Sequence, residues 1–516
     1  MRAPTPIPAS SNPTPPVVPT APTPGTEPSR VRRLLILAIC CMSMIVVVMD
    51  LSIVNVALPD IRRQLHASAD GLQWTIDAYA LVLAVFLVLS GSLADRFGRR
   101  RMFVIGLVIF GVGSLACGLA PTIGWLVAAR AAQAVGGTML NPVAMAIVAN
   151  TFSDPRERAR AIGVYGAMSG LALALGPVLG GLLVGAAGWR AVFMVNLPIV
   201  ALAVVLVTLL VPESRAARAR RFDPVAQLLV AVLLGGTVFA VIEGGSLGWT
   251  SPAILTAVAA SAASAIALVF VERRRREPLL EPKLFRSVPF VSALVMAILA
   301  LCGFQAFLFV ITLYLQTVRG LPAWSAGLCL LPIGVLVLAL SPISGRMVGA
   351  RGPRHPLLIA GVALTAAGVA LLWVTPATWM PALLAAFLLV GVFLGFVNPP
   401  ISNTAVSGMP RSMAGLAASL ASAGRQTGTA LGVAVAGVFV GPSLSILSTS
   451  IRHTSAQAAA FTDAARGIWW MLAGLGLALA VLAVMSTGRW AQGTARKAAA
   501  EFEQAPAQPP VSTVAR

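Results

Sequence analysis

Two ionisable residues lie inside apolar runs that are long enough to cross a membrane. Asp50 stands in the run 34–57, and Arg130 stands in the run 123–147. A lone carboxylate in a bilayer is strongly unfavourable, and an arginine there stays charged, so each needs a partner or a polar cavity. Both residues fall at a similar depth, which predicts one shared pocket that Gln133, one helical turn after Arg130, would extend. A proton that binds Asp50 would weaken the pair, so the pattern suits reversible proton binding.

Asp77 is a further acid within an apolar run, one turn after Trp74. Two interpretations stay open: Asp77 is a second proton-binding site, or it is a water-exposed acid at the outer rim that attracts cations. The second half of the chain differs, because no Asp or Glu occurs between Glu281 and Asp463. We therefore expect proton binding in the first half only. The polar residues that we expect to line a substrate cavity are Asn55, Gln305, Tyr314, Asn398, Asn403 and Arg425.

Composition indicates which elements position these residues. Of 516 residues, 58% are hydrophobic and only 10% are charged, whereas soluble domains carry about 25% charged residues. The chain therefore reads as an all-α protein that crosses a membrane many times. A spanning helix needs about 20 mostly apolar residues. Fourteen runs meet this rule: 34–57, 73–94, 102–119, 123–147, 160–184, 190–211, 225–243, 252–271, 289–313, 325–347, 356–374, 381–403, 413–440 and 466–487.

The charge distribution indicates orientation and excludes several classes of partner. The net charge is +20, but the basic residues form short clusters between apolar runs, without the basic face that nucleic acid requires. Alternate loops and the two tails hold 29 of the 37 Lys and Arg residues, which places both termini in the cytoplasm. The cysteines and histidines form no metal-binding spacing, and no P-loop occurs. We expect no cofactor, no metal and no ATP, and no acids or histidines gather as a membrane enzyme would need.

One charged bend occurs twice. Residues 91–101 read GSLADRFGRRR, and residues 345–354 read GRMVGARGPR, with the Asp and Arg of the first copy replaced by Gly and Ala. The first copy follows the second run and the other copy follows the tenth. This shift predicts two six-helix bundles with two additional helices between them, a plan in which the substrate site lies at the midplane between parallel repeats.

At this point the residues resemble a family. GSLADRFGRRR is similar to a signature of the major facilitator superfamily. Further stretches, in the expected order, resemble its fourteen-helix branch of drug:proton antiporters: MDLSIVNVALPDI, QWTIDAYAL, RAAQAVGG, GPVLGG, WRAVFMVNLPI, YLQTVRGLPAWSAGLCLLP and RQTGTALGVA. Two positions depart from the branch: Ala134 replaces a glycine, and Asp77 stands where a small polar residue is usual.

The resemblance also implies gating elements. In the loop 91–101, the glycines allow a tight turn, Asp95 would face a helix N-terminus of the other bundle, and Arg96 would pair with Asp154 or Glu157. These contacts would hold the inner face closed. In the GPVLGG stretch, proline permits a kink and glycines permit close packing. The gating residues expected in these two places are Gly91, Asp95, Arg96, Gly98, Arg99, Arg100, Gly176, Pro177, Gly180 and Gly181.

The expected function is proton-coupled efflux of lipophilic drugs or antibiotics across the bacterial cytoplasmic membrane, by a monomer that works by alternating access and uses only the proton gradient. Small substrates, protons and the lipid bilayer are its expected partners. Export of a self-made antibiotic, siderophore or lipid stays open, and so does proton symport. The expected domains are a disordered cytoplasmic tail at 1–30, an N-terminal six-helix bundle at 31–212, two additional helices with a basic linker at 213–286, a C-terminal six-helix bundle at 287–490 and a cytoplasmic tail at 491–516.

Overall fold

The chain is described here by a computed structural model, which covers residues 29–152, 154–214, 223–275, 282–407, 411–448 and 455–503. The expected tail at 1–30 lies outside the described residues, apart from its last two positions. The described part is built of helices: α1 (Arg30–Leu65), α2 (Ala69–Phe97), α3 (Arg99–Gly118), α4 (Ile123–Thr151), α5 (Pro155–Ala187), α6 (Ala191–Met194), α7 (Asn196–Leu210), α8 (Pro224–Leu247), α9 (Pro252–Arg274), η1 (Pro282–Arg286), α10 (Val288–Leu313), η2 (Tyr314–Val318), α11 (Ala323–Arg351), α12 (Arg354–Leu371), α13 (Met380–Val406), α14 (Arg411–Ser448), α15 (Ser455–Thr487) and α16 (Arg489–Glu503).

Short polar residues mark where several helices begin. Ser68 accepts a hydrogen bond from the amide of Gly71 at 3.1 Å, and Thr122 accepts one from Trp125 at 3.3 Å. Ser251 and Ser287 cap α9 and α10 in the same way. Because a side-chain oxygen satisfies an amide that has no partner inside the helix, these residues fix the position at which each helix begins.

Twelve helices in the described part are long and apolar enough to cross a membrane. One of these spans, Ala191–Leu210, is interrupted: α6 ends at Met194 and α7 begins at Asn196. Helices α5 and α14 have 33 and 38 residues and pack within the bundle, but they are not among the twelve. The all-α membrane fold is confirmed, and the count of fourteen spans stays a prediction.

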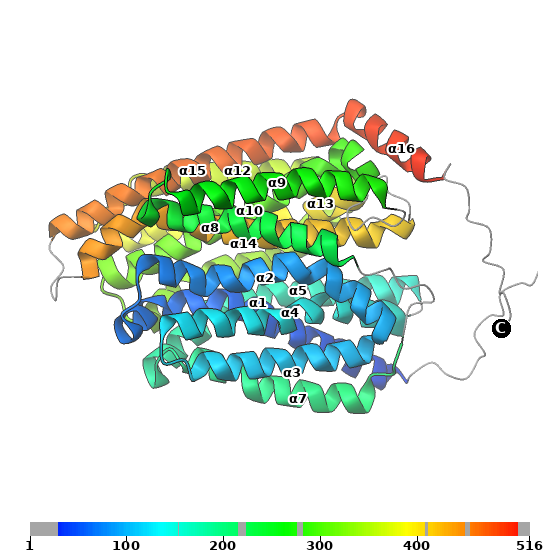
Figure 1. The fold of residues 1–516 in the computed structure, drawn as a ribbon, viewed down its shortest axis with the longest axis horizontal. Helices are drawn as coiled ribbons and strands as arrows, with labels where there is room; N and C mark the ends of the chain where they lie inside the picture. Colours follow the sequence, from blue (N-terminus) through cyan, green and yellow to red (C-terminus); the bar gives the residue numbers. More distant parts are fainter. Residues whose placement is uncertain are drawn as a thin grey trace, which may run out of the picture.

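The helices form two groups that run side by side along the long axis of the molecule (Figure 1). In the first group α1 packs on α5, and α4 packs on α2 and α3. In the second group α10 packs on α14, α11 on α13, and α12 on α15. The largest contacts between the groups join α5 to α11 and α2 to α14.

The two ends of the bundle are named here by their residues. The tail end, at the right of Figure 1, carries the start of α1, the turn between α2 and α3, and α16. The far end, at the left, carries the turn between α1 and α2 at His66. The two halves meet near the far end, where Gln316 Nε2 donates to the carbonyl of Val56 at 3.0 Å.

Helices α8 and α9 lie between the two groups in sequence and beside them in space. They pack on each other, and α8 also contacts both α2 and α14. The amide of Gln227 bonds to the carbonyl of Val85 near the tail end, and Trp74 Nε1 donates to Glu243 Oε1 at 2.9 Å near the far end. Thus α8 is tied to α2 at two levels while it covers the seam with α14.

Candidate functional site

The centre of the first group holds an ion pair between Asp50 of α1 and Arg130 of α4. Both side chains are 0% exposed, and Arg130 Nη1 donates to Asp50 Oδ2. Arg130 Nε donates to the carbonyl of Thr75 at 3.1 Å, and the guanidinium lies over the ring of Tyr79 at 4.1 Å from its centroid. A buried arginine needs such charge and dipole partners because it remains protonated. The juxtaposition of Asp50 and Arg130 that the sequence predicts is present.

Two amides hold the second carboxylate oxygen of the acid. Asp50 Oδ1 accepts from Gln133 Nε2 at 3.0 Å and from Asn196 Nδ2 at 3.1 Å. Both amide nitrogens also donate to Ser114 Oγ, each at 2.9 Å. Gln133 Oε1 accepts from Arg130 Nη1 at 2.8 Å. The charged form of Asp50 therefore has hydrogen-bond donors on both oxygens, which is how a protein accommodates a buried carboxylate.

Local structure explains why each group reaches this pocket. Gln133 lies three residues after Arg130, so both face one side of α4. Asn196 is the first residue of α7, directly after the interruption that follows α6. On α3, Gly113 lies against the backbone of Gln133, where a Cβ would not fit, so the glycine lets α3 approach and brings its neighbour Ser114 to the amides.

Sequence reasoning missed several members of this pocket. Asn196 lies in the stretch WRAVFMVNLPI, and Thr75 and Tyr79 lie in QWTIDAYAL. Both stretches carry the family resemblance, but the sequence does not indicate that these three residues contact Asp50 or Arg130. Ser114 carries no signal at all, because a serine in an apolar helix is common. A polar residue inside a spanning run is a signal for a buried polar site. This signal does not single out Asn196, because many other polar residues lie inside such runs.

Asp77 lies apart from this pocket, and the structure corrects its expected setting. Its side chain is 0% exposed, and both of its oxygens are buried without a hydrogen-bond partner, so it is no water-exposed acid at a rim. It shares a helical stripe with Trp74, Ala80 and Leu81, which pack against α8 and α14. Asp77 therefore lies in the seam between the halves that α8 covers.

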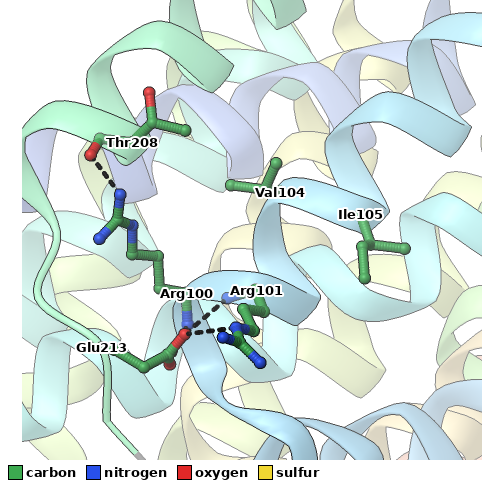
Figure 2. A pocket seen from close by; sticks show the side chains of 6 residues that line it. All are labelled: Arg100, Arg101, Val104, Ile105, Thr208 and Glu213. Carbon is green, nitrogen blue, oxygen red and sulfur yellow. Dashed lines mark hydrogen bonds and ion pairs between the residues drawn. The ribbon is translucent and has the colours of Figure 1, made fainter.

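The turn between α2 and α3 has the geometry that its glycine implies. Gly98 has φ 111°, a left-handed conformation that favours glycine. Glu213 accepts from the amides of Arg100 and Arg101 at 3.1 and 3.3 Å, and Arg99 donates its amide to the carbonyl of Ser214 at 2.9 Å. Figure 2 shows Arg100, Arg101 and Glu213 beside a groove of about 510 Å³ between α3 and α7.

Arg96 does not form the expected ion pair with Asp154 or Glu157 in this structure. Glu157 pairs with Arg33 of α1 at 3.1 Å, and Asp154 Oδ1 accepts from the amide of Glu157 at 2.8 Å. Arg96 is exposed and lies over the ring of Phe97 at 5.5 Å. The surroundings of Gly91 and the side chain of Asp95 lie outside what the structure describes, so the expected contact of Asp95 stays a prediction.

The GPVLGG stretch lies where three helices meet. A Cβ at Gly176 would meet Ser52 of α1, one at Gly180 would meet Ile53 at 2.8 Å, and one at Gly181 would meet the backbone of Ala323 and Trp324 in α11. From the other half, Gly327 lies against the backbone of Pro177. Small residues permit this approach of helix backbones.

The six residues expected to line a substrate cavity have different partners and different burial. The Tyr314 hydroxyl donates to the carbonyl of Thr375 at 2.7 Å, and Arg425 Nη2 donates to Ser422 at 2.5 Å, so both are used within the second group. Asn55 bonds to the carbonyl of Leu51 at 2.9 Å, and Gln305 is buried. Asn398 is half-buried, and Asn403 is exposed. Asn55 Oδ1 and Gln305 Nε2 are buried without a hydrogen-bond partner, and a shared polar lining of the six residues stays a prediction.

A small cavity does lie between the halves, and its lining is mostly apolar. Ser52 and Pro177 contribute from the first group, and the second group contributes Phe304, Leu308, Leu330, Ile333 and Gly334. Ser52 follows Asp50 by two residues on α1. The cavity is thus close to the charged pocket along the chain, and apolar contact is the chemistry that it offers.

A bundle of two helical groups, with a buried ion pair inside one group, is the plan expected of a membrane carrier. The chain belongs to the Major Facilitator Superfamily, whose profile matches residues 40–433. It is 38% identical over 405 residues to the multidrug resistance protein Stp of Mycobacterium tuberculosis, covering 78% of this chain and 75% of that protein.

Two other similarities extend this result. The tetracenomycin C resistance and export protein of Streptomyces glaucescens is 35% identical over 398 residues, covering 76% of this chain and 73% of that protein. Among solved structures, a bacterial homologue of the human lysosomal transporter Spinster, in an inward-facing and unoccupied conformation, matches with a TM-score of 0.62. That match is 18% identical and covers 92% of this chain and 99% of that one, so it shows the fold alone.

Proposed function

We propose that this chain exports lipophilic drugs or antibiotics by alternating access, in exchange for protons that bind at Asp50. The observation that carries the proposal is the fully buried pair of Asp50 and Arg130, whose attraction depends on one titratable group. In the charged state the pocket is satisfied on both oxygens. A proton on Asp50 removes the charge that offsets Arg130, which changes the relative free energies of two arrangements of the helices.

The cavity supports the choice of substrate class. In this conformation it has a volume of about 10 Å³, room for about one water, and Phe304, Leu308, Leu330 and Ile333 would present apolar surface to a substrate only once the halves separate. Relatives named for multidrug resistance, puromycin resistance and tetracenomycin C resistance support the same class. No resident cofactor enters the proposal, since the proton gradient supplies the free energy.

The proposed function includes the orientation of the chain and the membrane in which it works. Both termini lie in the cytoplasm of a bacterium, and the chain works in the cytoplasmic membrane as a monomer. The basic residues at the tail end support this orientation, because Lys and Arg accumulate on the cytoplasmic side. Asp77 acts as a second carboxyl whose surroundings change when α2 and α14 separate.

A second candidate function is export of a compound that the producing organism makes itself. One relative is named as both a resistance and an export protein for tetracenomycin C, from Streptomyces. The two candidates share one mechanism and differ only in cargo. Transport of a panel that contains both foreign drugs and antibiotics of the host would separate them.

The experiment is transport of ethidium and puromycin into everted membrane vesicles that contain the full chain, with a pH-sensitive dye to follow protons. Asp50→Asn is expected to reduce pH-driven uptake at least ~10-fold, because an amide cannot bind and release the proton. Asp463→Asn, at an exposed acid near the far end, is the matched control and should transport normally. Unchanged uptake by Asp50→Asn, or by wild type after the pH difference and the voltage are collapsed, refutes the proposal.

A further inference from the structure

Three buried polar atoms around the charged pair have no hydrogen-bond partner: Arg130 Nη2, the Tyr79 hydroxyl and Asn196 Oδ1. Of these, only Asn196 Oδ1 belongs to a side chain that contacts the Asp50 carboxylate and is itself an acceptor without a hydrogen to donate. Asn196 is 0% exposed, and its Nδ2 donates to both Asp50 Oδ1 and Ser114 Oγ. Its Oδ1 is buried and accepts no hydrogen bond. A buried carbonyl oxygen without a donor is unfavourable, so this free acceptor beside a carboxylate that is surrounded by donors calls for a physical reason.

The other amide in the pocket is bonded on both sides. Gln133 Nε2 donates to Asp50 and to Ser114, and Gln133 Oε1 accepts from Arg130. Cys117 Sγ also lies within hydrogen-bond reach of Gln133 Oε1, at 3.7 Å. Turning over the Gln133 amide would place two donors against each other at Arg130. Asn196 is not constrained at its oxygen, which accepts no hydrogen bond, although turning over its amide exchanges the two bonds of Nδ2 for bonds to Oδ1.

We propose that Asn196 is a positioning residue that serves both protonation states of Asp50 by turning over its amide. In the structure described here, Nδ2 donates to the carboxylate. When a proton from water binds Asp50 Oδ1, the amide rotates about its Cβ–Cγ bond, and Asn196 Oδ1 accepts the new O–H. This inference rests on the proposed binding of a proton at Asp50.

Ser114 can follow the same exchange. Its oxygen now accepts from both amides, and a hydroxyl can rotate its hydrogen to suit its neighbours. After Asn196 turns over, the Ser114 hydroxyl donates to Asn196 Oδ1 and still accepts from Gln133. The proton, delivered by hydronium, is the only atom added, and no covalent bond of the protein breaks. Asn196 Oδ1 then has two donors, while Nδ2 takes the position in which Oδ1 had no partner. The exchange is driven by the new O–H of Asp50, which would otherwise face the two N–H donors of the amides.

Among the ionisable groups near Asn196, Asp50 is the one whose charge we expect to change. The ionisable groups that interact with it are Arg130 from α4, Tyr79 from α2 and Cys117 from α3. Stretches 171–187 of α5 and 191–210 of α6 and α7 contain no ionisable side chain. Helices α10 and α11 also contact α1: α10 contributes Cys302, and α11 contributes Cys329 together with Arg346 and Arg351 at its tail end. Arg130 is the permanent charge that contacts Asp50, so proton binding at Asp50 changes the electric field at Asn196.

The direct test is infrared difference spectroscopy of the full chain in liposomes after a pH change, with no substrate present. Wild type is expected to show a protonated carboxyl band that is lost in Asp50→Asn. It should also show a side-chain amide difference band, which moves when the asparagines carry ¹⁵N and is lost in Asn196→Leu. If the carboxyl band forms without the amide band, or if the amide band persists in Asn196→Leu, the inference is overturned.

Transport provides the second readout, with ethidium as the probe in proteoliposomes. Asn196→Leu and Ser114→Ala are each expected to slow turnover by about tenfold at equal amounts of folded protein. Asn150→Leu, at an exposed amide near the tail end of α4, is the control and should be unaffected. If Asn196→Leu does not fold, Ser114→Ala is the deciding variant, because it preserves Asn196 and removes only the exchanging hydroxyl. Normal turnover in Ser114→Ala, together with an amide difference band at the wild-type frequency, overturns the inference.

The experiments distinguish an error in the proton site at Asp50 from an error in the role of Asn196. If Asp50→Asn loses neither the carboxyl band nor transport, the proposed proton site is wrong and the inference falls with it. If Asp50→Asn loses both while Asn196→Leu behaves as wild type, only the role of Asn196 is wrong.

Discussion

At the scale of single residues, Asp50 and Asp77 are two buried aspartates with different surroundings. Asp50 is paired with Arg130 and accepts hydrogen bonds from Gln133 and Asn196, all within one group of helices. Asp77 is equally buried but neither oxygen has a hydrogen-bond partner, and its stripe on α2 faces the other group. A buried carboxylate is tolerated only with compensation, so the two acids must contribute differently to stability.

Thermal unfolding of the purified protein tests this difference. Asp77→Asn is expected to leave the unfolding temperature unchanged or to raise it, because the amide has no charge to bury. Asp50→Asn is expected to destabilise the chain by about 3–5 kcal/mol, since it leaves Arg130 buried without a counter-charge. Asp463→Asn, which removes an exposed pair with Arg466, should change little. A larger loss of stability for Asp77→Asn than for Asp50→Asn would contradict this assignment.

At the scale of elements, α5 determines how closely the two groups meet near the far end. Its glycines lie against α1 on one side and against the backbone of α11 on the other. The neighbouring glycine of the same helix, Gly185, has nothing within 4 Å of an added Cβ. Among the glycines of α5 whose surroundings the structure describes, Gly176, Gly180 and Gly181 are closely packed and Gly185 is not, so we expect a change of gate to act at the level of the first three.

Gly181→Leu is expected to reduce efflux at least ~10-fold, because the side chain would collide with α11 and prevent the far end from closing. Gly185→Leu is the matched control on the same helix and should retain transport. Efflux and labelling of a cysteine near the far end by a membrane-impermeant reagent would be measured in parallel. The Gly181 variant should show increased labelling; equal transport and labelling in the two variants would count against a gating contact.

At the scale of the whole molecule, the charges divide the bundle into two unlike ends. The tail end carries the arginine cluster at 99–101 and helix α16, which packs its small residues Ala491, Ala495 and Ala498 inward. The far end carries few basic residues. This asymmetry supports the proposed orientation, in which the basic end faces the cytoplasm.

Cysteine labelling in intact cells checks this orientation. In a variant without the five native cysteines, His66→Cys should react with an impermeant maleimide from outside, because His66 is exposed at the far end. Arg496→Cys is exposed on α16 at the tail end and should react only after the cells are opened. The reverse pattern would show that the termini lie outside.

Hydropathy, charge spacing and motif order were sufficient to predict the all-α membrane fold, the family and the meeting of Asp50 with Arg130. Each of these follows from local rules: apolar length selects a span, and two opposite charges at one depth seek each other in a medium of low polarity. The turn at Gly98 was predictable for the same reason, since its residues carry their own conformational preference.

The tertiary structure alone decided which polar residues join the pair and which do not. Asn196 reaches Asp50 because the sixth span breaks just before it, whereas Tyr314 and Arg425 bond within their own half. Asp77 is sealed because α8 lies over the seam between α2 and α14, a contact that no periodicity encodes. Helix phase determines the direction in which a side chain points, but packing between distant helices determines what it meets there.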